Sequence, residues 1–295
     1  MERSHSAVAW WQALSGQCSD FSRIIVACGS MYWKFLLLCL SMATSAASPF
    51  PSEAQRSSDL LKHWREGGKL QMLALPDKTQ MLVAEEVSHA PYVQGGVILL
   101  PGFFHDPATP GIDRSLYQHL PDRGWIIVSL TSPHLTLPVN TLPTTMDWQQ
   151  IAAALKPRLD AALNLLDQQG VRNIILIGQG AAGMAIPMIY PDNWPTNLHG
   201  LILLTPPRLP DDANPLLTAL DHMQIPLALV YAHANVPNDP GCPACVQAAR
   251  RHKLPLREIY RPAIDNEFSD ISDALSWSLI DWMFPFAGQT QLKQP

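Results

Sequence analysis

The stretch that most constrains the fold is 171–186, which reads Val-Arg-Asn-Ile-Ile-Leu-Ile-Gly-Gln-Gly-Ala-Ala-Gly-Met-Ala-Ile. Its apolar run, 174–177, has the length of a buried strand. The small apolar residues at 181–186 suit a helix that packs closely on that strand. A sharp glycine-rich turn, 178–183, joins the two. Such a strand–turn–helix places the apex of its turn at the carboxyl edge of a sheet.

Two kinds of chemistry use a turn of this shape. In α/β-hydrolases the turn reads G-x-S-x-G, and its apex serine is the nucleophile. In dinucleotide-binding folds it reads G-x-G-x-x-G and holds a pyrophosphate. The turn here, Gly-Gln-Gly-Ala-Ala-Gly, matches the second pattern. The chain around it nevertheless fits the first fold, with Gly180 where the nucleophile would stand.

Strand patterns alternate with helix patterns along the rest of the chain. Besides the strand before the glycine turn, strands are expected at 69–75, 80–87, 96–102, 124–130, 198–204, 226–231 and 256–261. Helices are expected at 54–66, 113–120, 147–169, 215–223, 244–253 and 270–283, the last closed by Pro285. This alternation predicts an α/β fold, a three-layer sandwich around a mostly parallel eight-stranded sheet with an antiparallel opening hairpin.

The order of these elements also carries a resemblance. The strand 97–100 followed by Pro101 and Gly102, and the elbow-like turn 178–183 after the fifth strand, are its main motifs. Across about residues 69–284 the chain resembles a bacterial domain-of-unknown-function family of secreted α/β-hydrolase-like proteins. The resemblance implies the α/β-hydrolase fold and export, but it implies no particular reaction.

Residues 31–47 have the three parts of a secretory signal peptide. The positively charged end is Met-Tyr-Trp-Lys, and the apolar stretch is 35–40. The small residues at 44–48 allow cleavage after Ala46 or Ala47. A membrane anchor or an ordinary apolar helix is the alternative. The apolar run is shorter than the roughly 20 residues that span a bilayer, so no stable membrane span is expected after cleavage. The signal peptide therefore predicts that the protein is periplasmic or secreted.

The signal peptide divides the chain into five parts. Residues 1–30 are expected to be a non-native or removed extension, followed by the signal peptide at 31–47. A helical lead-in at 48–68 precedes the domain at 69–284, and a C-terminal tail occupies 285–295.

Export also bears on the cysteines. Cys18, Cys28 and Cys39 precede the expected cleavage site, whereas Cys242 and Cys245 remain at C-x-x-C spacing. In an oxidising compartment this pair is expected to form a disulfide. The pair follows a strand and opens a helix, a position that lowers a thiol pKa. A local disulfide is nevertheless favoured over thiol exchange, because the pair lacks a thioredoxin-like βαβ context.

Two classes of partner are disfavoured. The formal net charge of −5 leaves no basic footprint for nucleic acid. A dinucleotide fingerprint normally opens the first βαβ unit and is followed about 20 residues later by an acidic residue. Here the turn follows the fifth strand, and no acid follows the next strand before Asp211. No cofactor is therefore expected, and close packing of helix on sheet accounts for the glycines.

The catalytic groups of a serine hydrolase are missing at the expected positions. Acyl transfer needs a nucleophile, a base, an orienting acid and oxyanion donors. Gly180 has no side chain, and neither Gln179 nor Ala181 replaces one. The loop after the last strand, 262–268, contains acidic residues but no histidine. Asp239, after the seventh strand, is an acid with no base to orient.

Polar residues at the carboxyl ends of the strands form the candidate site, because open α/β sheets bind ligands there. They are His105, Asp106, His134, Gln179, Thr205, His233, Asp239, Asp265 and Glu267. A small molecule or a peptide is the expected ligand. No metal is expected, because the histidines lack the short paired spacings of metal sites.

Together these observations predict an exported α/β-hydrolase-like protein that acts as a non-catalytic binding or assembly factor. Two enzymatic alternatives stay open. One is an esterase-like hydrolase that uses non-standard groups such as His105, His134 or His233. The other is a thiol oxidoreductase that uses Cys242 and Cys245.

Overall fold

The structure is a computed structural model, and it describes residues 51–103, 105–133, 135, 145–191, 193–232, 241–287 and 292–293. The expected extension at 1–30 and the expected signal peptide at 31–47 lie outside the described residues.

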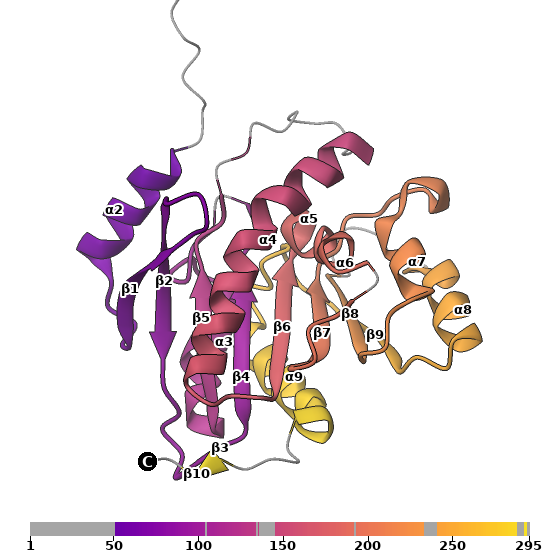
Figure 1. Cartoon of the computed structure of the whole chain (residues 1–295). Helices are drawn as coiled ribbons and strands as arrows, with labels where there is room; N and C mark the ends of the chain where they lie inside the picture. The colour runs from indigo at the N-terminus through magenta and orange to yellow at the C-terminus, as the bar shows by residue number, and fades with distance from the viewer. Residues whose placement is uncertain are drawn as a thin grey trace, which may run out of the picture. The chain divides into compact units, whose positions relative to one another are not determined.

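Eight strands form one sheet in the order β1-β2-β5-β4-β6-β7-β8-β9 (Figure 1). Their bounds are β1 Lys69–Ala74, β2 Gln80–Glu86, β4 Gly95–Leu100, β5 Trp125–Leu130, β6 Ile174–Gln179, β7 Leu198–Leu204, β8 Leu227–Ala232 and β9 Leu256–Arg261. β2 pairs antiparallel with both β1 and β5, and the remaining neighbours pair in parallel. The predicted mostly parallel sheet with an antiparallel opening hairpin is therefore confirmed.

The central strands are buried on both faces, as their continuous apolar sequences predict. Every residue of β4, β5 and β6 is buried. The edge strands β1 and β9 are more exposed. The strands that lead to the candidate site thus lie in the middle of the sheet.

Helices cover both faces of the sheet, so the protein has three layers (Figure 1). On one face lie α4 (Thr145–Gln168), α6 (Ile186–Ile189), α7 (Pro215–Leu220) and α8 (Pro243–Arg251). On the other lie α3 (Ile112–His119) and α9 (Ser272–Ala287). The predicted apolar stripe of α4 is buried against the sheet: Ile151, Leu155, Leu159, Leu163 and Leu166. None of the described helices is both long enough and apolar enough to cross a bilayer.

The lead-in helix α2 (Glu53–His63) is held by two arginines. Arg158 on α4 donates to both carboxylate oxygens of Glu53, at 2.6 and 2.9 Å. Arg56 Nη2 donates to the carbonyl of Ser132 at 2.6 Å. Because Ser132 follows β5, α2 is docked at the carboxyl edge of the sheet.

Two details differ from the sequence-based expectation. α9 continues through Pro285 to Ala287, since a proline near a helix end removes one backbone hydrogen bond without forcing the helix to stop there. Within the expected tail, β10 (Leu292–Lys293) pairs antiparallel with β3 (Tyr92–Val93). Two-residue strands show no sequence periodicity and could not be predicted.

Candidate functional site at the elbow

β6 leads into the short helix α5 (Gly180–Met184) through a sharp turn with Gly180 at its apex. The φ angle of Gly180 is +57°, in the left-handed region that L-residues rarely adopt. A Cβ placed on Gly180 would meet no described atom within 4 Å. The backbone therefore has the form of a nucleophile elbow, with no side chain at the nucleophile position.

The other two glycines of the turn bring the strand and the helix together. A Cβ on Gly178 would lie 2.5 Å from the Cα of Gly183. A Cβ on Gly183 would overlap the carbonyl group of Gly178. Close crossing of strand and helix therefore accounts for both glycines, and no bound nucleotide is needed to explain the pattern.

Gln179, the residue before the apex, joins three loops. It is 3% exposed, and its Oε1 accepts a hydrogen bond from the Gly102 N–H at 3.1 Å. The same oxygen lies 3.2 Å from His105 Nδ1. Its Nε2 donates to the carbonyl of Asn266 at 3.5 Å. Gln179 thus connects the elbow to the loops after β4 and β9, and both ends of its amide are engaged within the protein.

His105 faces oxygen acceptors on both sides of its ring. On one side, the Nδ1 atom of His105 lies 3.7 Å from Asp113 Oδ2, in addition to its contact with Gln179 Oε1. On the other side, the Nε2 atom of His105 lies 3.9 Å from Glu267 Oε1. The Asp113 carboxylate raises the pKa of His105 against the opposing effect of burial, and Gln179 and Glu267 add to the rise. A ring with acceptors at both nitrogens favours the imidazolium, which has no free lone pair with which to accept a proton.

Asp113 is the residue of this cluster that the sequence did not indicate. It stands in the first turn of α3 and is 3% exposed. Burial raises its pKa, and His105 opposes that shift. Its Oδ1 has no hydrogen-bond partner in the part of the chain that the structure describes. The only sequence signal was a carboxylate in the first turn of a helix, a common and non-specific feature.

Seven of the nine sequence-predicted site residues fall into three groups. Of the other two, Asp106 accepts the Ala108 N–H at 2.9 Å in a turn of the loop after β4, and Thr205 directly follows β7. His105, Gln179 and Glu267 come together beside the elbow. Asp265 lies on the Glu267 loop, but its carboxylate accepts the Ser269 N–H at 2.9 Å, a bond that lowers the Asp265 pKa and shapes the turn. The third group lies outside the described residues: His134, His233 and Asp239. Across the described ranges, no three His, Cys, Asp or Glu side chains are grouped so as to hold a metal ion.

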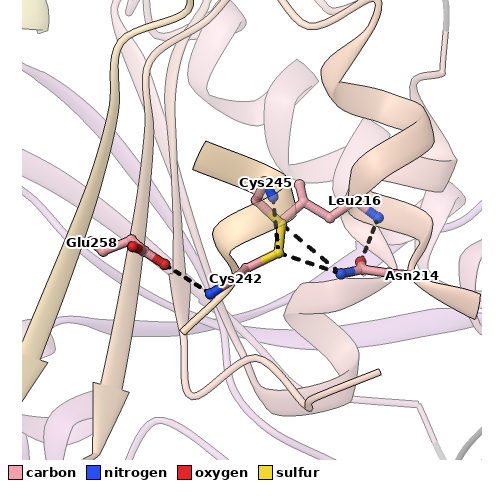
Figure 2. Close-up of a disulfide and its surroundings, with 5 residues drawn as sticks. All are labelled: Asn214, Leu216, Cys242, Cys245 and Glu258. Carbon is pink, nitrogen blue, oxygen red and sulfur yellow. Dashed lines mark hydrogen bonds between the residues drawn. A yellow bond between two sulfur atoms is a disulfide. The ribbon is translucent and has the colours of Figure 1, made fainter. Parts of the chain in front are cut away.

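Cys242 and Cys245 form the predicted disulfide (Figure 2). Cys242 is the N-cap of α8, and Cys245 stands in the first turn of that helix. The disulfide therefore lies at the carboxyl edge of the sheet, beyond β8.

Solved hydrolases share this architecture. An esterase domain from Rhodothermus marinus matches with a TM-score of 0.55 and 13% identity, over 75% of this chain and 99% of that one. An esterase from Pyrococcus furiosus matches with a TM-score of 0.57 and 12% identity, over 81% and 99%. An alpha-beta serine hydrolase homologue from Coxiella burnetii matches with a TM-score of 0.53 and 13% identity, over 72% and 96%. The protein has the α/β-hydrolase fold.

Identities this low establish the fold and not the reaction. No protein-family model matches the chain, and no curated protein sequence matches it. The residues at the elbow therefore carry the information about its chemistry.

Proposed function

We propose that this protein is an exported α/β-hydrolase-fold protein that binds a ligand at the carboxyl edge of its sheet without hydrolysing it. The observation that carries the proposal is Gly180, which stands at the apex of the elbow and offers no atom that could attack a carbonyl. The proposal includes a periplasmic or secreted location. It also includes membership of the bacterial domain-of-unknown-function family that the sequence resembles.

The histidines and the loop after β9 support a non-catalytic role. In the hydrolase fold that loop carries the catalytic histidine, and 262–271 contains none. His105, which contacts Gln179 beside the apex, is held toward its protonated form by Asp113. A general base must be unprotonated at the working pH, so this environment opposes such a role.

The exposed part of the cluster suggests the kind of ligand. The side chains of His105 and Glu267 are 25% and 37% exposed, and they present a donor and an acceptor next to each other. A peptide group offers the complementary acceptor and donor. We therefore favour a peptide, or a small molecule with an amide-like group, as the ligand.

A binding screen with matched variants tests the proposal. A defined library of short peptides is screened by saturation-transfer NMR against the wild-type protein, H105A and E267A. Binding to the wild type that is lost in both variants is the expected result. The variant K156A, on the exposed surface of α4, is the control and should bind as the wild type does. Equal binding in all four proteins would mean that this site is not the binding site, and absence of any binding would refute a peptide ligand.

A second function has one observation in its favour. A buried carboxylate beside a histidine, as in Asp113 and His105, is also the arrangement of an orienting acid and a base. An esterase that used these groups would hydrolyse p-nitrophenyl esters, lose that activity in H105Q and retain it in G180A. Absence of wild-type turnover supports the binding function instead.

A further inference from the structure

The two residues of the Cys242–Cys245 disulfide, drawn in Figure 2, differ in burial. Cys245 is fully buried, whereas Cys242 is partly exposed. Exchange between thiols and a disulfide needs one sulfur that an incoming thiolate can reach and one that can leave. We propose that this pair is a thiol–disulfide exchange site that oxidises the cysteine thiols of an extended peptide.

Two N–H donors lie near the sulfurs. The Cys245 N–H, in the first turn of α8, donates to Cys242 Sγ at 3.2 Å. Asn214 Nδ2 lies 3.7 Å from Cys242 Sγ and 3.9 Å from Cys245 Sγ. Donors of this kind at a helix N-terminus favour a thiolate over a thiol. Either sulfur is therefore stabilised when it carries the negative charge of an exchange reaction.

The orientation of Asn214 is fixed by a second bond. The residue is 8% exposed, and its Oδ1 accepts the Leu216 N–H at 3.0 Å as the N-cap of α7. Because the oxygen is engaged in the cap, only the amino end of the amide can face the sulfurs. A helix cap needs only the oxygen, which serine or aspartate would supply equally well. The donor aimed at the disulfide is thus additional to the needs of the cap.

A cavity of about 120 Å³ adjoins the disulfide. Its wall includes Cys242, Cys245, Pro206, Arg208, Leu209 and Tyr231. A space of this size is comparable to the roughly 150 Å³ apolar cavity that binds benzene in another protein. It therefore suits one apolar side chain next to a substrate cysteine, as an extended peptide would present.

The segment before the disulfide is held in place. The Cys242 N–H donates to Glu258 Oε1 at 2.9 Å. Gly241 has a φ of +66°, and a Cβ there would overlap Tyr260 and Glu258. The negative charges of Glu258 and of Asp211 in the cavity wall oppose thiolate formation, and the positive charge of Arg208 in the same wall supports it.

The proposed exchange takes place in two displacements. A substrate thiolate attacks Cys242 Sγ, which forms a mixed disulfide and releases Cys245 as a thiolate near Asn214 Nδ2. A second substrate thiolate then attacks the substrate sulfur, which forms the substrate disulfide and releases Cys242 as a thiolate. Two substrate thiols are oxidised, the protein disulfide is reduced, and the two substrate protons pass to the protein thiolates or to water. A low-molecular-weight disulfide such as oxidised glutathione restores the protein by the reverse exchange.

The full chain with C18S, C28S and C39S isolates the pair for a test. Incubated with a reduced two-cysteine peptide, this protein should form about one peptide disulfide per chain, measured by mass spectrometry. Adding C245S should give a protein that forms a mixed disulfide with oxidised glutathione through Cys242. Adding C242S instead should give a protein that does not, because Cys245 is buried.

Asn214 provides a more specific variant. N214D keeps the cap oxygen but replaces the donor by a second carboxylate oxygen. In the C245S chain, alkylation of Cys242 by iodoacetamide at pH 7 should slow by up to about tenfold, because the added negative charge disfavours the thiolate. N214S, which keeps the cap without the charge, should slow it less. Absence of exchange in the two-cysteine chain, or alkylation of Cys242 in the C245S chain no faster than that of a free cysteine peptide, would mean that the disulfide is structural only.

Discussion

Replacing Gly183 with alanine should destabilise the protein far more than the same replacement at Gly180. At Gly183 the new Cβ would overlap the backbone carbonyl of Gly178, which cannot rotate away. We expect this overlap to cost about 3 kcal/mol or more, the upper end for overpacked cores. The higher helix propensity of alanine offsets about 1 kcal/mol of this loss in stability. The net loss in unfolding free energy is then at least about 2 kcal/mol.

At Gly180 the same methyl group meets no described atom, and the only cost is the positive φ. That conformation costs an L-residue about 1–2 kcal/mol. Alanine also lowers the conformational entropy of the unfolded chain, which stabilises the folded protein by about 0.4–1 kcal/mol. G180A should therefore lose between about 0 and 1.6 kcal/mol.

Urea unfolding followed by circular dichroism measures both variants against the wild type. The midpoints should fall at an unchanged slope, with the larger fall in G183A. Equal midpoints, or a lower midpoint for G180A than for G183A, would contradict the close crossing of β6 and α5 at the elbow.

Three further predictions concern the elbow, the histidine and the N-terminus. G180S should fold with a loss of about 1–2 kcal/mol from its positive φ and should gain no esterase activity; rapid ester turnover would reveal a base within reach of the apex. NMR titration should give His105 a pKa above 6.5, so its stabilising effect is present below pH 6.5 and is lost as the pH rises through the raised pKa. H105Q should flatten this part of the pH–stability profile. A His105 titration at the ordinary histidine pKa would refute the prediction. N-terminal sequencing of the exported protein should begin at Ala47 or Ser48, and finding 1–30 in it would rule out the signal peptide.

The order of elements could be predicted because it depends on local apolar patterns. β4, β5 and β6 read as continuous apolar runs because both of their faces are covered. The elbow could be predicted because the glycine spacing in 178–183 reflects a backbone that crosses itself closely. At Gly180, by contrast, the structure leaves room for a side chain, and only the positive φ opposes one.

The side-chain cluster could only be predicted in part, because long-range packing assembles it. The loops of His105 and Glu267 were indicated by their places at strand ends. Gln179 was expected to face a ligand, but its amide is engaged by loops far away in the sequence. Asp113 could not be identified, because its burial depends on where α3 packs. Likewise nothing local to Asn214 shows that it faces the two cysteines.

We propose that the elbow of this fold has no nucleophile. The most direct test is to incubate the purified wild-type protein with a fluorophosphonate probe and to measure the intact mass. No probe adduct is expected under conditions that label an active serine esterase completely. A stoichiometric adduct on the native protein, absent after heat denaturation, would contradict it, and peptide mapping would then locate the nucleophile away from Gly180.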